Sequence, residues 1–395
     1  MENQIFKREI IIVGTGLNGL LTAIMFAKNN ISVTIIEKQA LNLDSSVKSD
    51  GRALAITNLG YNILKNYEIF NGLETVINPI NHIHITDQYT PTYLHFDNKI
   101  VENKPLGFMI DAHELHQKLK LMASSCANIE IIDNETILKI NNTPEHVVFT
   151  TSKARTFEAK LLIACDGKRS LLREQAGLKV KFIDYQQTAI VCNVKHEFSH
   201  DNVAQEMFLE PGPFAILPLA NNRSGIVWTE KPEMARVYLQ LPEDEFMFHL
   251  SKRFTDYLGK LTLDSKVFSY PLHASIVPRY YKDRLCLLGD AAHQIHPIAG
   301  QGFNQGIFDA DCLVENIIKF QNLGIDIGSE IVLKEYQKLR KFDNLSMTFF
   351  THLTEKMFSN DQPVKKILRR ASLGIINKMP LLKKQLMTYA MGKRY

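Results

Sequence analysis

The sequence has few cysteines, one tryptophan and no long apolar run. Its 5 cysteines among 395 residues are scattered and form no Cys-x-x-Cys pair. This spacing argues against a disulfide framework and against a cysteine-based zinc site. No apolar run is long enough to span a bilayer, and the N-terminus has no basic segment leading into a hydrophobic stretch with a cleavage site. We therefore expect a cytoplasmic protein whose thiols are buried.

Linkers, repeats and low-complexity segments are missing as well. No stretch is rich in Ser, Gly or Pro, and no segment repeats. With 45% hydrophobic and 22% charged residues, the composition is that of a globular protein rather than a disordered one. The length of 395 residues exceeds that of most single domains. We therefore expect two intimately joined domains with a large core.

Acidic residues are absent from segment 363–395, which holds nine Lys or Arg. Because the whole chain carries +4, the first 362 residues carry −5. Within the tail, residues 364–375 combine apolar residues at helical spacing with basic residues on the opposite face, which predicts a basic amphipathic helix. This pattern suits a membrane surface, and solvated lysines on a packed helix are the alternative. Nucleic acid is disfavoured because no binding module accompanies the tail.

The first forty residues predict a strand, a helix and a second strand. Residues 10–13 are a β-branched run typical of a buried parallel strand, and residues 32–36 supply the next strand. Segments 76–103 and 181–275 change to short alternating runs that indicate a mostly antiparallel sheet. From about residue 303 the chain is mostly helical. The pattern predicts a nucleotide-binding domain that is interrupted by a sheet domain.

A glycine-rich turn, GTGLNG, follows the first strand at Gly14 to Gly19. In such a turn Gly14 makes the tight exit, Gly16 lets the backbone approach a pyrophosphate, and Gly19 lets the helix pack close to the sheet. The helix N-terminus favours the negative phosphate. Glu37, at the end of the second strand, can accept hydrogen bonds from ribose hydroxyls. The acid disfavours a 2′-phosphate, so the motif predicts FAD or NAD rather than NADP.

Two later motifs also place an acid and a glycine at the end of a strand. Residues 161–170 run from a buried strand into Asp166 and Gly167, which could hold a polar ligand or form an ordinary Asp-Gly turn. Residues 284–306 end a strand at Gly289 and Asp290, whose carboxylate can bind a sugar-alcohol hydroxyl. A Gly-Gln-Gly turn then opens a second helix. His293 and His296 are better explained as hydrogen-bonding scaffolds than as metal ligands, and no metal is expected.

Together these residues resemble the flavoprotein aromatic hydroxylases with a p-hydroxybenzoate-hydroxylase-like fold, and within them the ubiquinone-biosynthesis monooxygenases. The resemblance covers nearly the whole chain. Its most specific part is GDAAHQIHPIAGQGFNQG from Gly289 to Gly306. Supporting segments are DGRALAI at 50–56, GPFAILPL at 212–219, IVWT at 226–229, YPL at 270–272 and the YxxxRxxDN pattern that begins at Tyr336.

The resemblance implies roles for individual residues of this chain. The three glycines of the first motif would cradle the FAD pyrophosphate, Asp166 and Gly167 would serve FAD and the approach of NAD(P)H, and Asp290 would bind the ribityl chain. The segment Pro297 to Asn304 would lie along the isoalloxazine. The implied catalytic positions are Pro297, Gly300 and Gly302. The implied cofactor-binding residues are Gly14, Gly16, Gly19, Glu37, Arg52, Asp166, Gly167, Gly289, Asp290, Gly300, Gln301, Gly302 and Asn304.

The expected fold is α/β, with a Rossmann-like FAD-binding domain, an inserted, mostly antiparallel β-sheet substrate domain and a C-terminal helical region. The FAD-binding domain would comprise 1–75, 104–180 and 276–360, the substrate domain 76–103 and 181–275, and the basic tail 361–395. Segments of the sheet domain that contain Phe214, Ile216, Leu217, Leu219 and Trp228 could form an apolar wall that keeps water from the flavin. Each residue is equally well explained as core, and core is the better explanation for any single one.

The implied activity is hydroxylation of a polyprenylated phenol by O₂ through a flavin C4a-hydroperoxide, with NAD(P)H or a redox protein as the electron donor. The protein would be cytoplasmic and peripheral on the membrane face, and other quinone-biosynthesis proteins are candidate partners. Alternatives are a hydroxylase of a soluble aromatic acid, a flavin-linked prenyl-chain reductase and a non-catalytic FAD-binding scaffold subunit.

Overall fold

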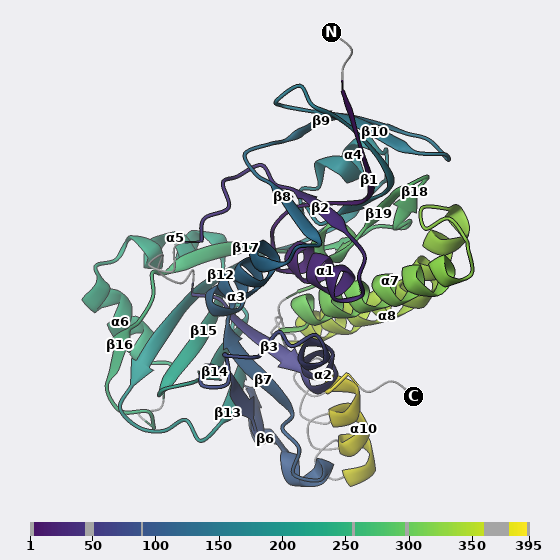
Figure 1. Cartoon of the computed structure of the whole chain (residues 1–395). Coiled ribbons are helices and arrows are strands. Elements are labelled where there is room, and N and C mark those ends of the chain that lie inside the picture. The colour runs from purple at the N-terminus through teal and green to yellow at the C-terminus, as the bar shows by residue number, and fades with distance from the viewer. Residues whose placement is uncertain are drawn as a thin grey trace.

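A computed structural model describes residues 4–43, 51–87, 90–254, 257–296, 300–358 and 379–392. Pro297 and the predicted amphipathic helix at 364–375 lie outside the described residues. The two large sheets occupy different parts of the molecule, and the long helices α7 (Gln301–Asn322) and α8 (Glu330–Phe358) run beside the first of them (Figure 1). Within the described ranges, no helix has the length and apolar character that crossing a membrane requires.

The first sheet has eight strands, and its central strands are parallel. Buried β-branched runs such as residues 10–12 fill it, because helices cover a parallel sheet and leave its strands apolar on both faces. Helices α1 (Leu17–Lys28) and α3 (Ala112–Ser125) pack together beside it. Its strands are β18 (Tyr281–Lys282), β19 (Leu285–Leu287), β11 (Thr156–Ala164), β1 (Ile5–Val13), β2 (Val33–Ile36), β8 (Ile129–Ile132), β10 (Val147–Thr151) and β9 (Ile137–Asn142).

The second sheet has nine strands, and its pairs are antiparallel except for β13 with β5. Together the two sheets confirm the expected α/β fold with an antiparallel sheet. The proposed residue boundaries of the two domains stay a prediction. The strands are β20 (His293–Gln294), β17 (Phe268–Ile276), β12 (Lys181–His196), β15 (Arg223–Glu230), β14 (Pro213–Leu219), β13 (Val203–Phe208), β5 (His82–Asp87), β6 (Thr90–Asp97) and β16 (Leu261–Leu263).

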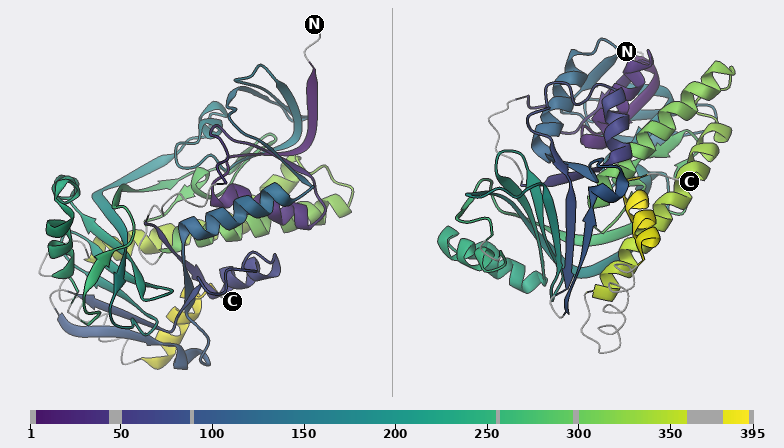
Figure 2. Two further views of the ribbon diagram at one scale, coloured as in Figure 1. Left: turned by 60° about the vertical axis from the view of Figure 1, so that its left-hand side comes forward. Right: turned by 90° about the horizontal axis from the view of Figure 1, so that it is seen from below.

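The two faces of the nine-stranded sheet have different coverings. Helices α5 (Pro232–Gln240) and α6 (Glu243–Ser251) cover the outer face, as both further views also show (Figure 2). Parts of the inner face pack against a small sheet of β3 (Ala53–Thr57), β7 (Gly107–Asp111) and β4 (Asn78–Ile80). Helices α2 (Asn58–Asn66) and α4 (Leu171–Gln175) and the short helices η1 (Asn98–Val101) and η2 (Gly289–Ala291) complete the connections.

The expected apolar wall is only partly correct. Leu217 and Leu219 lie on the inner face. Phe214, Ile216 and Trp228 instead lie in the core between the sheet and α5 and α6. Side chains alternate along a strand, so the residues of one segment divide between the two faces.

The end of the basic tail packs on the body. Helix α10 (Pro380–Ala390) carries Met387 into a cluster with residues of the small sheet, and Met391 just beyond it joins the same cluster. The backbone N–H of Leu59 also donates to the carbonyl oxygen of Met391 at 3.1 Å. The five cysteines are free thiols, of which Cys192 and Cys286 are fully buried and the others half-buried.

Candidate cofactor site

The three glycine-containing motifs meet at one edge of the eight-stranded sheet. Strands β19, β11, β1 and β2 are consecutive neighbours and all parallel, so their carboxyl ends share an edge. The GTGLNG turn follows β1, Asp166 follows β11 closely, and Gly289 follows β19. Polar ligands bind outside the carboxyl ends of the strands in open α/β sheets. The fold therefore brings the predicted residues together from three distant parts of the sequence.

Some of the predicted glycines are needed because the protein itself approaches them. A Cβ on Gly14 would lie 2.5 Å from the carbonyl oxygen of Cys165, and one on Gly19 would lie 2.0 Å from that of Gly14. A Cβ on Gly289 would lie 2.2 Å from the side chain of Asn18. These contacts lock the three motifs against one another. Gly14 and Gly289 also have φ of +109° and +61°, which glycine adopts without strain.

Other predicted glycines face open space instead. A Cβ built on Gly16, Gly167 or Gly302 meets nothing within 4 Å. Gly16 has an ordinary φ of −66° and caps α1 without a side chain. Because neither packing nor backbone conformation requires a glycine at this position, its missing side chain leaves room for a ligand at the helix N-terminus. This open cradle fits the pyrophosphate of a dinucleotide.

Glu37 stands at the end of β2 beside the glycine turn. Its Oε2 accepts hydrogen bonds from the backbone N–H and the hydroxyl of Thr15, at 2.7 and 2.8 Å. Its Oε1 accepts one from the N–H of Gln39 at 3.0 Å. The carboxylate is therefore held in place by the turn, and its remaining acceptor capacity suits the adenosine ribose.

Two aspartates supply further acceptors at this edge. Burial raises the pKa of Asp166, and its Oδ1 has no hydrogen-bond partner among the described residues. The side chain of Asp290 is exposed. Desolvation by the surrounding protein nevertheless raises the pKa of its carboxyl group, although the charges of His293 and Arg52 act to lower it. The guanidinium of Arg52 lies 5.9 Å from the centre of the Tyr270 ring. These carboxylate oxygens and a nearby arginine fit the hydroxyl-rich and phosphate-bearing parts of FAD.

The Gly-Gln-Gly turn opens α7, which begins at Gln301, the middle residue of the turn. Gly300 caps the helix with φ of +62°, and a Cβ there would lie 2.8 Å from the Cβ of Ala55. The side chain of Asn304 is fully buried and bonds to the backbone of β3, accepting from the N–H of Thr57 at 2.8 Å and donating to the carbonyl of Ala55 at 2.7 Å. Asn304 thus fixes the turn against β3. Its implied role in cofactor binding therefore rests on its place beside the turn and not on a free side chain.

A buried charge network supports the third motif from behind. Asp309 on α7 accepts hydrogen bonds from His293 at 2.5 Å, from the N–H of Gly289 at 3.2 Å and from Arg340 of α8 at 2.7 Å. Asn344 also donates to it at 3.1 Å. Burial opposes the charge of Asp309, but His293 and Arg340 outweigh it and hold the pKa well below its ordinary value. The network confirms His293 as a scaffold, and the YxxxRxxDN pattern was its sequence signal.

His296 is the last described residue before the segment 297–299. It is fully buried, and its ring stands edge-on to Tyr185 with ring centres 4.6 Å apart. Its Nε2 lies 3.4 Å from the amide oxygen of Gln187, and burial lowers its pKa to about 4. A neutral, packed imidazole agrees with the expected scaffold role.

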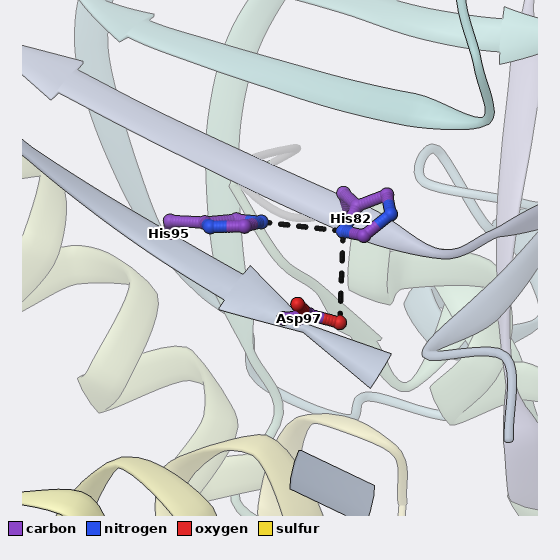
Figure 3. Close-up of side chains that lie close together, drawn as sticks. All are labelled: His82, His95 and Asp97. Atoms are coloured by element: carbon purple, nitrogen blue, oxygen red, sulfur yellow. Dashed lines mark hydrogen bonds and ion pairs between the residues drawn. The ribbon is translucent and has the colours of Figure 1, made fainter. Parts of the chain in front are cut away.

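A group of polar side chains that no motif predicted lies on the β5–β6 hairpin (Figure 3). His82 Nδ1 lies 3.2 Å from His95 Nε2 and 3.8 Å from the Asp97 carboxylate, so one ring donates to the other beside an acid. The three ligand atoms lie within 4.8 Å of one another. Burial and the charge of His82 lower the pKa of His95, and the positive charge of Lys383 on α10 lowers it further. A hydrogen-bonded pair accounts for this arrangement, which only the register of the hairpin reveals.

Comparison with known proteins agrees with this geometry. A family model described as an FAD binding domain matches residues 7–341. A ubiquinone hydroxylase of Rhodospirillum rubrum is 36% identical, with 97% of this chain and 89% of the relative covered. The 3-demethoxyubiquinol 3-hydroxylase of Escherichia coli is 28% identical, with 99% and 100% covered.

The fold is also shared with solved structures. The p-nitrophenol 4-monooxygenase of Pseudomonas putida superimposes with a TM-score of 0.80 at 20% sequence identity, covering 99% of this chain and 100% of that one. At this identity the match concerns the fold alone. The whole-length sequence matches, the FAD-binding domain and the convergent glycine motifs place the chain in the ubiquinone hydroxylase family of FAD-dependent monooxygenases.

Proposed function

We propose that this protein is an FAD-dependent monooxygenase that hydroxylates the aromatic ring of a polyprenylated phenol in ubiquinone biosynthesis. The observation that carries the proposal is the open space at Gly16 and Gly167, which follow two parallel strands at their shared edge, and at Gly302 in the first turn of α7. The names of the relatives supply the substrate class.

The residues of the site have separate tasks in this proposal. The N-terminus of α1 holds the pyrophosphate, Glu37 the adenosine ribose and Asp290 the ribityl hydroxyls. Helix α7 begins at Gln301, within the segment proposed to lie along the flavin, and the partial positive charge of its N-terminus would stabilise the negative charge that develops there on reduction. Because cofactor chemistry performs the oxidation, no side-chain nucleophile is required.

The bound flavin would supply oxygen activation. One atom of O₂ enters the ring, and the other leaves as water after taking two electrons from NAD(P)H or a redox protein and two protons. The chain must orient the ring and exclude water. The inner face of the nine-stranded sheet offers apolar side chains such as Val191, Val227 and Tyr270 for this purpose.

Labelled oxygen tests the proposal directly. The purified holoenzyme, an electron donor, a prenylated phenol and ¹⁸O₂ should yield a phenol with one added ¹⁸O atom, detected by mass spectrometry. A prenyl-chain reductase would consume the donor without incorporating the label, and a scaffold subunit would bind FAD without substrate-dependent oxidation. If only an unprenylated aromatic acid acquires the label, the quinone assignment is wrong.

We also propose that the basic tail holds the enzyme at an anionic membrane surface. Polyprenylated phenols reside in the bilayer, and the sequence at 364–375 is that of a basic amphipathic helix. Replacing Lys365, Lys366, Arg369 and Arg370 with Gln is expected to reduce sedimentation with vesicles of anionic lipid, because each basic residue near such a surface contributes about 1 kcal/mol. Neutral vesicles serve as the control. Unchanged binding to anionic vesicles would show that these residues are merely solvated.

A further inference from the structure

Glu206 is a carboxylate on the inner face of the nine-stranded sheet. Its strand β13 pairs with β14 and β5, so that Glu206 stands opposite Ala215 and Ile85. Directly paired residues share a face. Ala215 is two residues from Leu217, which packs against the small sheet, whereas its neighbours Phe214 and Ile216 lie in the outer core. The register therefore directs Glu206 toward the side on which the FAD-binding elements lie.

The row that contains Glu206 is otherwise apolar. Across the sheet it runs through Ile85, Glu206, Ala215, Val227 and Val191. Glu206 is half-buried, and no hydrogen bond or ion pair reaches its carboxylate from the described residues. Burial alone raises its pKa to about 7. Apolar surroundings disfavour the charged form of an unpaired acid, and a ligand that donates a hydrogen bond to the carboxylate would offset this cost.

A short series of contacts connects Glu206 to the turn before α7. Gly300 approaches Ala55 of β3, and Ala53 and Ala55 belong to the same apolar cluster as Leu217. Ala215 lies two residues before Leu217, or about 7 Å along the strand. Glu206 is the cross-strand neighbour of Ala215. The turn before α7, strand β3 and the row that contains Glu206 therefore lie on the same side of the nine-stranded sheet.

We propose that Glu206 accepts a hydrogen bond from the ring hydroxyl of the phenol and thereby orients the ring for hydroxylation. The proposal rests on the proposed function and adds a substrate contact to it. A phenol offers one strong donor on an otherwise apolar molecule, which matches one acceptor on an apolar face. A hydrogen bond to a charged acceptor is among the stronger ones in proteins.

The pH dependence follows from the protonation of this group. Below about pH 7 the carboxyl of Glu206 is protonated and a weaker acceptor, so kcat/KM should rise as the pH increases through 7. Asp87, which pairs with Phe208 one row further along the same face, is the other acid on β5 and β13 that faces this side. Arg52 lies further across the sheet beside Tyr270. In the Asp87→Asn variant, kcat/KM should therefore still rise near pH 7, because Glu206 is unchanged.

Steady-state kinetics of the FAD-loaded enzyme with a prenylated phenol test the contact. Glu206→Leu is expected to raise KM about tenfold or more, because it removes a charged hydrogen-bond partner. Glu206→Gln keeps an acceptor, so KM should change only a few-fold while the rise near pH 7 disappears. Gln205→Leu is the matched control, because its side chain points to the opposite face of the same strand.

The outcomes separate the two proposals. If the wild-type enzyme hydroxylates the phenol and Glu206→Leu keeps the wild-type KM, the contact does not exist. A rise near pH 7 that persists in Glu206→Gln would also contradict it, even where the Leu variant fails to fold. Absence of ¹⁸O incorporation by the wild-type enzyme would instead overturn the proposed function and the contact with it.

Discussion

Arg340→Met is expected to lower the free energy of unfolding by about 3–5 kcal/mol, because it removes one of the two cationic partners of the buried Asp309 carboxylate. Arg340 is 1% exposed and donates to Asp309, to Gln305 at 3.0 Å and to Asn344 at 2.9 Å. Methionine fills similar space but carries no charge to balance that of the Asp309 carboxylate. Urea unfolding followed by circular dichroism measures the loss.

Arg279→Met provides the matched control. Arg279 makes an ion pair with Glu330 at 3.3 Å, but both side chains are largely exposed. An exposed pair contributes about 0–1 kcal/mol, so this variant should unfold almost like the wild type. If the two variants lost the same small amount, the buried network would contribute no more than a surface ion pair.

The same network gives the stability a defined pH dependence. The pKa of Asp309 is lower in the folded protein than its ordinary value of 3.8. A depressed pKa stabilises the fold above the unfolded-state pKa, and this contribution decreases as the pH falls below it. The difference in unfolding free energy between wild type and Arg340→Met should therefore be full at neutral pH and shrink below about pH 4.

Local motifs in the sequence predicted the cofactor edge well. GTGLNG, the Asp166–Gly167 turn and the Gly289–Asp290 turn each follow a buried strand, and parallel strands bring their ends to one edge whatever the loops between them do. The structure was needed only to show which of the glycines contact protein and which face open space. Whether a glycine faces protein, like Gly19, or open space, like Gly16, depends on what other segments place beside it.

The sequence did not predict features that depend on which face of a strand a residue occupies or on which helices pack together. The sequence left open whether Phe214, Ile216 and Trp228 lie on the flavin side or in the core, because a shift of one residue exchanges the two faces of a strand. Glu206 was overlooked for the same reason, since only the pairing of β13 shows where it points. The bond between Asp309 and Arg340 needs α7 and α8 side by side, which no single motif specifies.

Gly16→Val is expected to weaken FAD binding while leaving the fold intact. Its φ of −66° and ψ of 172° suit valine, and a Cβ there meets no protein atom within 4 Å. The added side chain would instead occupy the space proposed for the pyrophosphate. Overpacking of a tight contact costs about 1–3 kcal/mol, which corresponds to roughly a 5- to 150-fold loss of affinity. Titration of the apoprotein with FAD, followed by flavin fluorescence, measures this loss.

Gly19→Ala distinguishes a blocked ligand from a damaged turn. Its Cβ would lie 2.0 Å from the carbonyl oxygen of Gly14, so this variant should lose stability with or without FAD. Gly16→Val should melt at the temperature of the wild-type apoprotein and differ from the wild type only when FAD is added, because ligand binding stabilises only a fold that can bind it. Wild-type FAD affinity in Gly16→Val would mean that the open space beside α1 is not the pyrophosphate site, and the cradle would then have to be assigned to another part of the cofactor.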